Sequence, residues 1–513
     1  MIPNLLSWLI FLPLAGALLI LTVPKENKNV IRSIAIGTSG VTLIVSLILW
    51  GAFDRAFSGL QFYQAAPWID LGLVRLNYEI GIDGLSLPLI ILTTIVTTLS
   101  LFASLNISER VKEFYIWTLV LLTGMLGVFV AQDLFLFFLF FELTLIPMFF
   151  IIGIWGGKEK TYAAFKFLVY TGLGSAIMFL SFLGMYYYAF QATGLQMLGG
   201  SGFSIPILTQ IFAEPAFAEV LTTGVRGALF LGLFVAFAIK LPVFPFHTWL
   251  PNAHVEAPTA ASMILAGVLL KMGGYGLIRI GVGILPDQAS RFALLIAILG
   301  VINIIYGALL ALVQTDLKRL VAFSSISHMG IVLLGIASFT ASGMQGAIFQ
   351  LVSHGFISAL LFFMVGAIYE RTKTRTISEL GGLSKSVPVL AGFTLAAAMA
   401  SVGLPGLSGF VSELLAFIGI FGADASILPA AKTLGVIAGI GIILTAAYLL
   451  WAMQRTTFGQ LDDKYKELSD ARPLEYVPMI GLLGFSILIG VYPNILSDVI
   501  NITVIDILSR IGG

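Results

Sequence analysis

Residues 225–280 read VRGALFLGLFVAFAIKLPVFPFHTWLPNAHVEAPTAASMILAGVLLKMGGYGLIRI, and the rest of the chain can be understood around them. The stretch contains two apolar helical runs, each with one lysine in its middle, Lys240 and Lys271. A charge at the centre of a bilayer costs from about 3 to more than 10 kcal/mol, so it is seldom kept without a use. Pro242 and Pro245 interrupt the first run just past its lysine, because proline removes a backbone donor. A buried cation beside a broken helix is typical of ion pathways in transporters.

The composition places the whole chain in a membrane. Of its 513 residues, 58% are hydrophobic and only 10% are charged, and the mean hydropathy is +1.03, whereas soluble proteins have about 25% charged residues. There is no cysteine, which excludes disulfides, thiolate metal sites and cysteine-held iron–sulfur clusters from this chain. A net charge of +1 without a basic tail gives no sign of nucleic-acid binding. The apolar N-terminus has no basic start and no clear cleavage site, so we expect a retained first helix.

The apolar runs predict an all-α integral membrane protein with about fourteen transmembrane helices, because each run has the roughly twenty residues that a crossing needs. Two longer polar segments, 53–81 and 191–224, interrupt the pattern, and we expect a short surface helix in the second. The transmembrane helices are expected near residues 3–23, 31–52, 82–106, 113–131, 133–155, 162–190, 225–246, 256–281, 291–313, 319–338, 343–369, 387–420, 431–457 and 475–495.

The lysines and arginines are divided unequally between the two sides of these helices. Most of the 27 basic residues fall in loops that follow odd-numbered helices, and Lys240 and Lys271 alone are expected within the membrane. Positively charged loops favour the cytoplasmic side. Both termini are therefore expected on the lumenal or periplasmic side.

Two short motifs indicate an internal repeat. IKLP at 239–242 resembles VGLP at 402–405, and the two motifs lie in helices seven and twelve, which cross in opposite directions. Proline-broken helices in inverted positions are the mark of an inverted-repeat transporter. We therefore predict two inverted five-helix repeats, helices 4–8 and 9–13, with Pro-broken helices 7 and 12. The expected domains are residues 1–110 (helices 1–3), 111–285 (first repeat), 286–460 (second repeat) and 461–513 (helix 14).

Two carboxylates are also expected at membrane depth. Glu142 lies inside DLFLFFLFFELTLIPMFF and is a candidate partner for Lys240; opening or closing such a pair would change how readily the lysine holds its proton. One alternative is that the Glu142 carboxylate reaches the interface from near a helix end. Another is that Lys240 is only a structural member of an ion pair. Glu413 follows Pro405 by eight residues and is a candidate site of proton release, or else a satisfied polar group in a packed bundle.

Lys271 and the histidines complete the set of buried polar candidates. Lys271 has no carboxylate close in sequence and could alternate between charged and neutral forms, unless it snorkels to the interface. His328 and His354 lie well inside their helices and could bridge the lysines and Glu413, because histidine titrates near neutral pH; simple hydrogen bonding is the alternative. His247 and His254, beside WLPN, are weaker candidates.

Three strings carry a family resemblance. QTDLKRLVAFSSISHMG (314–330), KLPVFPFHTWLPNAHVEAPT (240–259) and FFELTLIPM (140–148) resemble the antiporter-like membrane subunits of respiratory complex I. Length, helix count and GIDGLSLPLIILT (81–93) most resemble chain 4 of NAD(P)H–quinone oxidoreductase, of the cyanobacterial or chloroplast kind. Glu413, where the distal chain 5 has lysine, and the absence of a long C-terminal extension after helix fourteen favour chain 4 over chain 5.

The resemblance implies a proton path in which Glu142 pairs with Lys240, and Lys271 and Glu413 complete the relay. It implies a proton-translocating subunit of an NAD(P)H- or ferredoxin-quinone oxidoreductase, with no redox centre or cofactor in this chain. Quinone (plastoquinone in a photosynthetic membrane), iron–sulfur clusters and NAD(P)H or ferredoxin would be bound by partner subunits. The expected partners are other membrane-arm subunits and lipid, without nucleic acid, in a thylakoid or bacterial inner membrane.

Two other functions stay open at this point. A subunit of a multisubunit Na⁺(K⁺)/H⁺ antiporter would share the fold and nearly the same buried residues. A b-type cytochrome, with a haem held by His328 and His354, is a third possibility. Redox partners that co-purify would favour the oxidoreductase over the antiporter, and a Soret band from the isolated chain would favour the cytochrome.

Overall fold

The computed structural model describes residues 4–70, 75–197, 202–217 and 219–511. Thirteen helices in this described part are long and apolar enough to cross a membrane, and the shorter apolar helices α16 and α17 make a further, broken pair. The all-α membrane fold is therefore confirmed. The long helices are α1 (Leu5–Thr22), α2 (Lys28–Ala52), α3 (Ser86–Ala103), α4 (Val111–Val130), α5 (Leu134–Trp155), α6 (Lys160–Met197), α8 (Thr223–Lys240), α13 (Ala293–Leu312), α14 (Leu317–Ala337), α15 (Ala341–Thr372), α18 (Ala431–Thr456) and α19 (Tyr476–Val491), together with the composite span Thr259–Val282.

The composite span changes helix type along its length. It consists of α10 (Thr259–Ile264), a π-helical segment at Leu265–Leu269, α11 (Leu270–Gly276) and a second π-helical segment at Leu277–Val282. Single π-helical turns are rare and are frequent at functional sites. The remaining short helices are α7 (Ile205–Ala213), α9 (Trp249–Glu256), α12 (Pro286–Arg291), α16 (Pro388–Val402), α17 (Ser408–Phe421) and α20 (Asn494–Ser509).

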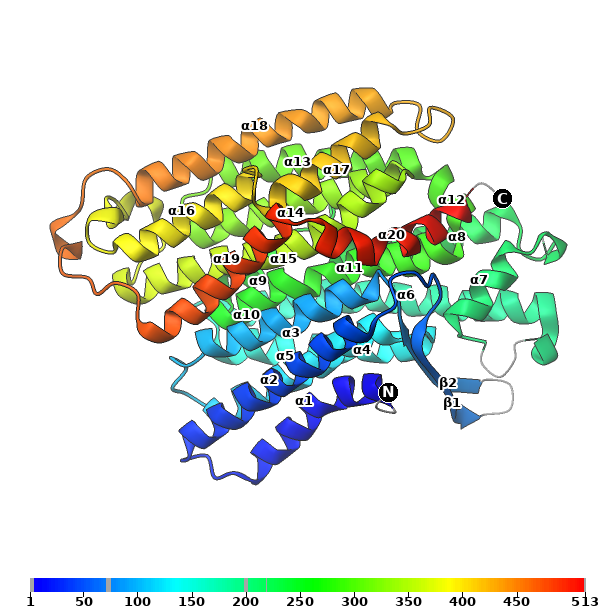
Figure 1. The fold of residues 1–513 in the computed structure, drawn as a ribbon, viewed down its shortest axis with the longest axis horizontal. Coiled ribbons are helices and arrows are strands. Elements are labelled where there is room, and N and C mark those ends of the chain that lie inside the picture. The colour runs from blue at the N-terminus through cyan, green and yellow to red at the C-terminus, as the bar shows by residue number, and fades with distance from the viewer. Residues whose placement is uncertain (1–3, 71–74, 198–201, 218, 512–513) are drawn as a thin grey trace.

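The polar segment 53–81 contains the two strands of an antiparallel hairpin, β1 (Gln61–Asp70) and β2 (Arg75–Ile82), which the sequence analysis did not anticipate. Aromatic and β-branched residues, which favour strands, are mixed with polar ones there, so the segment is too polar for a transmembrane helix. The hairpin and both chain ends lie at the same end of the helix bundle (Figure 1). We call this end the hairpin face and the other end the opposite face.

Two helices are broken in mid-membrane, as predicted. The helix expected at 225–246 stops at Lys240, two residues before Pro242, and the chain turns before α9 begins. The helix expected at 387–420 is divided into α16 and α17 around Pro405. Gly403 ends α16 with a φ of 84°, a conformation that glycine adopts at little cost.

Two short helices, α7 and α20, lie outside the expected transmembrane helices. The short helix expected within 191–224 is present as α7. Helix α20 was not expected, because residues 494–509 mix apolar residues with Asp498 and Asp506 and follow Pro493, which separates them from α19. The C-terminal segment therefore contributes two helices rather than one.

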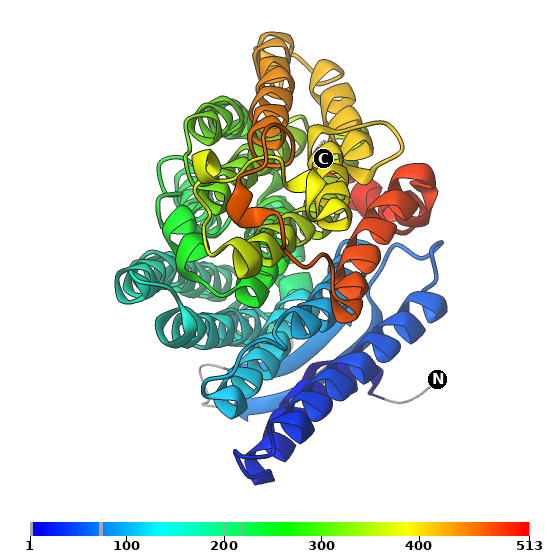
Figure 2. The same cartoon turned by 90° about the vertical axis from the view of Figure 1, so that its left-hand side faces the viewer.

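The most deeply buried part of the bundle is formed by three spans: Thr259–Val282, α14 and α15. The most apolar part of each is entirely buried inside the chain, whereas that of α2 or α19 is 28% buried. Helix α15 packs against α3, α10, α14, α16, α17, α19 and α20, and the end-on view in Figure 2 places α1 and α2 at one edge of the bundle and α18 at the other. Polar side chains on the three central spans therefore face protein rather than lipid.

The division of the chain into two inverted repeats stays a prediction, and the packing is compatible with it. Helix pairs α4–α5, α5–α6 and α6–α8 are in contact in the first half. The pairs α13–α14, α14–α15 and α15–α17 are in contact in the second half, in the same order.

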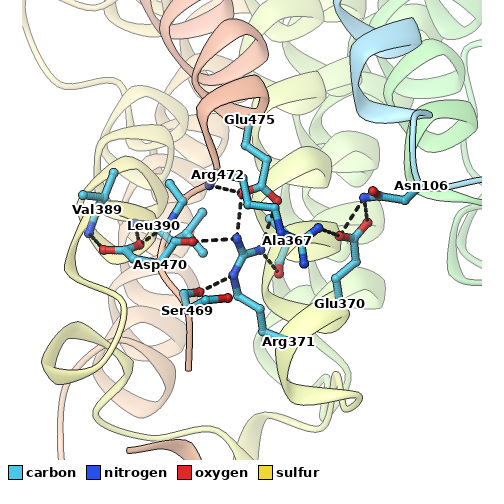
Figure 3. A network of polar contacts seen from close by, with 11 residues as sticks. Asn106, Ala367, Glu370, Arg371, Val389, Leu390, Ser469, Asp470, Arg472 and Glu475 are labelled. Atoms are coloured by element: carbon cyan, nitrogen blue, oxygen red, sulfur yellow. Dashed lines mark hydrogen bonds and ion pairs between the residues drawn. The ribbon is translucent and has the colours of Figure 1, made fainter. Parts of the chain in front are cut away.

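On the opposite face, Arg371 fixes the long loop before α19 to the end of α15 (Figure 3). Its guanidinium donates to both carboxylate oxygens of Glu475, at 3.1 and 2.6 Å. It also donates to the carbonyl oxygens of Ser469 (2.7 Å), Asp470 (2.9 Å) and Ala367 (2.9 Å). The arginine side chain is only 3% exposed, so this charge is both desolvated and fully hydrogen-bonded.

Replacing Arg371 by alanine is expected to destabilise the chain by about 3–5 kcal/mol, because Glu475 would keep a buried charge without its partner. Limited proteolysis in membranes should then cleave the loop 457–475 faster than in the unaltered protein. Arg319→Ala is the matched control, since that arginine is exposed and lies outside the contacts of Arg371 described above. Equal cleavage rates in both variants would contradict this structural role.

Candidate functional site

The break after α8 places Lys240 at the end of a helix in the middle of the bundle, and side chains replace the backbone bonds that the break removes. The indole of Trp249 donates to the carbonyl of Ile239 (2.9 Å). Asn303, on α13, accepts from the backbone N–H of Phe244 (2.7 Å) and donates to the carbonyl of Pro242 (3.2 Å). Irregular backbone is tolerated at membrane depth only where protein satisfies it in this way. The broken helix is therefore a stable feature that presents Lys240.

Lys240 is 2% exposed, and its ammonium group makes no hydrogen bond to any described residue. Its Nζ lies 4.7 Å from the ring centre of Phe141 and 5.8 Å from that of Phe167, so aromatic faces partly compensate its charge. Glu142 on α5 is the charged group whose field acts on it, but the described residues show no direct bond between the two. The Glu142 Oε1 atom is also buried without a hydrogen-bond partner among them. Among the described residues, no hydrogen bond or ion pair therefore joins the two members of the predicted pair.

Lys271 lies halfway along the composite span, about 18 Å from its start at 1.5 Å per residue. The side chain is completely buried. Its ammonium group donates to the carbonyl of Ala266, in the preceding π-helical segment, and lies 2.8 Å from Nδ1 of His354. The lysine therefore contacts His354 on α15, one of the two histidines that the sequence offered as possible bridges.

Two histidines extend this contact into the second half of the chain. The ring of His328, on α14, lies 5.4 Å from that of His354, measured between centres. Nε2 of the Gln350 side chain lies 3.2 Å from Nδ1 of His328, and Nε2 of His328 lies 3.1 Å from Ser401 Oγ. The Ser412 hydroxyl in turn donates to Oε1 of the Gln350 side chain. The imidazole is held in one orientation by groups from three helices.

Glu413 lies at the end of this series, on α17. Its Oε1 is 3.7 Å from Nδ1 of His328. The carboxylate also approaches the break in the helix so closely that a Cβ atom on Gly403 would be 2.9 Å from Oε2. A cavity of about 10 Å³, lined in part by His328, His354, Ser401 and Glu413, is at the lower limit for one water molecule. Lys271, His354, His328 and Glu413 therefore form one buried polar series.

The same geometry does not fit a haem between His328 and His354. The tilted rings are too close for a porphyrin to lie between them, and their nitrogens already meet Lys271, Gln350 and Ser401. Within the described residues, no group of three or more histidine, aspartate or glutamate side chains could hold a metal ion. The third function considered from the sequence is disfavoured by these contacts.

Two further buried residues, His254 and Lys318, lie beside the series. His254, on α9, is completely buried against the ring of Phe362 (4.3 Å), and neither of its ring nitrogens has a partner among the described residues. The charges that act on it are Lys271 and Lys318, and Lys318 is itself buried, donating to the carbonyl of Ala257 at 2.5 Å. Only the folding of α9 against α14 brings these groups together, so no pattern in the sequence places His254 beside Lys318.

His247 is placed differently from the other histidines. It lies in the break after Lys240, 3% exposed, stacked on Phe244 (5.8 Å) and edge-on to Tyr306 (5.2 Å). It makes no contact with the series from Lys271 to Glu413 among the described residues. Its position places it with the helix break after Lys240 and not with that series.

Comparison with known families gives two matches that together span most of the chain. Residues 131–440 match the family described as NADH:quinone oxidoreductase/Mrp antiporter, transmembrane. Residues 9–129 match the amino-terminal family of NADH-ubiquinone oxidoreductase chain 4. The second match covers most of the part of the chain that precedes the predicted repeats and extends into the first repeat, which was predicted to begin at residue 111.

Curated relatives agree with these matches. The chain is 44% identical to NADH-quinone oxidoreductase subunit M of Rhodobacter capsulatus, over 97% of this chain and 95% of the relative. It is 42% identical to NAD(P)H-quinone oxidoreductase chain 4 1 of a Picosynechococcus species, over 99% and 92%. Similar proteins therefore occur in both Rhodobacter and Picosynechococcus.

Solved structures share the fold. A chain of respiratory complex I from Thermus thermophilus, solved with bound NADH, superposes with a TM-score of 0.85 at 29% identity, covering 99% of this chain and all of that chain. A chain of the Mrp complex from a Dietzia species superposes with a TM-score of 0.80 over 99% of this chain, at 21% identity. The second likeness concerns the fold alone.

Proposed function

Because this chain belongs to the NADH:quinone oxidoreductase/Mrp antiporter family, and within it to the chain 4 type, we propose that it carries protons through Glu142, Lys240, Lys271, His354, His328 and Glu413. It does so as a membrane-arm subunit of a proton-translocating quinone oxidoreductase of the complex I type. The observation that carries the proposal is the buried contact of Lys271 with His354, continued by His328 to Glu413.

The chemistry of each group suits a relay. A lysine gives up its proton more easily when it is desolvated and holds it more firmly when a carboxylate approaches, so a changing distance between Glu142 and Lys240 would switch the affinity of Lys240 for its proton. His354 and His328 can accept a proton on one nitrogen and release it from the other. Glu413, beside the cavity and the broken helix, receives the proton last.

Proton uptake is proposed from the opposite face, through Lys318 and His254. Lys318 opens α14 on that face, and the charges of Lys318 and Lys271 both act on His254. Both ring nitrogens of His254 have no partner among the described residues, which leaves them available to bind and release a proton on this route.

Electron transfer is proposed to take place in partner subunits. Quinone, iron–sulfur clusters and NAD(P)H or ferredoxin would bind there, and the relay of this chain would respond to conformational or electrostatic changes that those reactions cause. We propose an energy-converting membrane as the location, either thylakoid or bacterial inner membrane, with both termini on the lumenal or periplasmic side. The bias of basic residues toward the opposite face supports this orientation.

The antiporter function is supported less well. It rests on the shared fold with the Mrp complex chain, whereas the two curated relatives named above are oxidoreductase subunits and are more than 40% identical. Purification of the chain with its natural partners separates the two functions, since only the oxidoreductase would bring quinone-reducing subunits with it.

The direct test of the proposal is Lys240→Ala in the assembled complex. We expect fewer protons to be moved per quinone reduced, because Lys240 is the group whose proton affinity Glu142 controls. The measurement is acidification of membrane vesicles against the rate of quinone reduction. Lys25→Ala, which changes an exposed lysine, is the control and should leave the ratio unchanged. Normal assembly with an unchanged ratio in Lys240→Ala would remove Lys240 from the path.

A further inference from the structure

A second polar series runs from Lys271 toward the hairpin face, away from the histidines. Tyr275 and Arg279 follow Lys271 at intervals of four residues on the same buried span, so the three share one side of the helix. Arg279 Nε lies 3.4 Å from the Tyr275 hydroxyl. That hydroxyl donates to the carbonyl of Phe129 (3.1 Å) and lies 3.1 Å from Ser86 Oγ. Apart from Lys271, none of these groups takes part in the path to Glu413.

An ion pair closes this series at its outer end. Arg279 Nη2 lies 2.5 Å from Asp83 Oδ1, and the two side chains are only 10% and 7% exposed. The same Nη2 donates to Ser86 Oγ at 3.3 Å, so one guanidinium covers both oxygens. Asp83 also accepts from the backbone N–H groups of Leu85 (3.0 Å) and Ser86 (3.1 Å), which fixes it at the start of α3.

The charge state of Asp83 is consistent with a closed pair. Burial pushes the pKa of the Asp83 carboxyl upward, but the neighbouring Arg279 and the backbone N–H groups outweigh burial and hold that pKa below its usual value. The carboxylate therefore stays ionised, and the ion pair persists.

A pocket of about 410 Å³, whose wall includes several charged and polar residues, lies on the hairpin face beside this ion pair. One water molecule needs only ~10–15 Å³ of such space, so the pocket has room for many. Asp83 and Arg279 belong to its wall, whereas Ser86 does not and is completely buried. The other wall residues come from the segment before β1, from Gln132, from α7 and from the end of α20.

We propose that this pocket is an aqueous vestibule and that the Asp83–Arg279 ion pair is a gate between it and Tyr275. The gate gives Lys271 a proton outlet on the hairpin face that is separate from Glu413. This inference rests on the proposed function, because it requires Lys271 to carry a proton.

The transfer uses three groups and leaves the arginine unchanged. Lys271 turns its ammonium group from His354 toward Tyr275, one helical turn or about 6 Å farther along the axis. Its N–H bond breaks as an O–H bond forms on Tyr275, which passes its own proton to Ser86, and Ser86 passes its proton to vestibule water. Each broken bond is matched by a new one, and Lys271 is left neutral. Arg279 keeps its proton and acts only by moving away, since a guanidinium is not deprotonated in proteins.

Thiol labelling tests the gate, because the natural chain has no cysteine and any labelled peptide reports the introduced residue. A membrane-impermeant thiol reagent is applied to the hairpin face of the assembled complex. Ser86→Cys is expected to react slowly alone and about tenfold faster when combined with Asp83→Asn, which weakens the pair. Thr209→Cys, in the pocket wall, should react in both backgrounds, and the buried Thr93→Cys in neither.

A second variant that weakens the same ion pair keeps the test decisive if the Asp83→Asn variant does not assemble. Arg279→Gln weakens the same ion pair from the other side and should also expose the cysteine at position 86. If that cysteine stays unreactive in both backgrounds while Thr209→Cys is labelled, the gate does not exist.

Proton translocation tests the outlet. Tyr275→Phe keeps the edge-to-face contact with Phe129 (5.1 Å) and removes only the hydroxyl. We expect it to lose part of the protons moved per quinone reduced, and Tyr275→Phe with Glu413→Gln to lose what either single variant retains. Unchanged translocation in Tyr275→Phe would overturn the outlet and leave the proposed function intact. Unchanged translocation after loss of Lys271 itself would instead overturn the proposed function.

Discussion

Replacing Lys271 by methionine is expected to stop proton movement through this chain while the bundle still assembles. Methionine fills a similar volume and carries no charge, so the fully buried site loses its proton carrier without a large cavity. Removal of a positioned proton-transfer group typically costs about 10²–10⁴-fold in rate. Vesicle acidification per quinone reduced should therefore lose the whole share that this chain contributes.

An arginine at the same position distinguishes a relay from a structural charge. Lys271→Arg keeps a cation beside His354 but does not release its proton at accessible pH. We expect Lys271→Arg to be as defective in translocation as Lys271→Met. If arginine instead restores the proton-to-quinone ratio, Lys271 serves only as a fixed charge. Lys432→Met, at an exposed lysine, controls for a general effect of the substitution.

Replacing Glu413 by glutamine is expected to have the second largest effect. Glutamine has the same shape and can still hydrogen-bond, but it cannot accept a proton from the His328 side, so movement past His328 should fall by about 10²-fold. The measurement is again proton translocation per quinone reduced. Translocation that survives in Glu413→Gln and disappears when Tyr275→Phe is added would belong to the outlet on the hairpin face.

A conservative substitution at the same position, Glu413→Asp, is the comparison for Glu413→Gln. A shorter carboxylate keeps the chemistry but increases the 3.7 Å separation from His328, so partial translocation is expected. Glu467→Gln, at an exposed carboxylate in the loop before α19, should behave as the unaltered protein. Full translocation in Glu413→Gln would remove Glu413 from the path.

Most of the buried candidates could be chosen from the sequence, because the cost of a charge in hydrocarbon depends on the residue and its apolar neighbours alone. Lys240, Lys271 and Glu413 are all buried in the structure. The two breaks were equally readable, since Pro242 and Pro405 act on the backbone locally. The hairpin at 61–82 and helix α20 were missed because neither resembles a membrane span in composition.

The sequence by itself determined that this is a helical membrane protein of about fourteen crossings, with ionisable groups at membrane depth, because hydropathy and proline act within a few residues. Only the tertiary structure decided which of those groups meet. Lys271 contacts His354 83 residues away, and Arg279 contacts Asp83 196 residues away in the other direction along the chain. Such contacts depend on how helices pack against one another, and a pattern within one helix does not contain the identity of its neighbour.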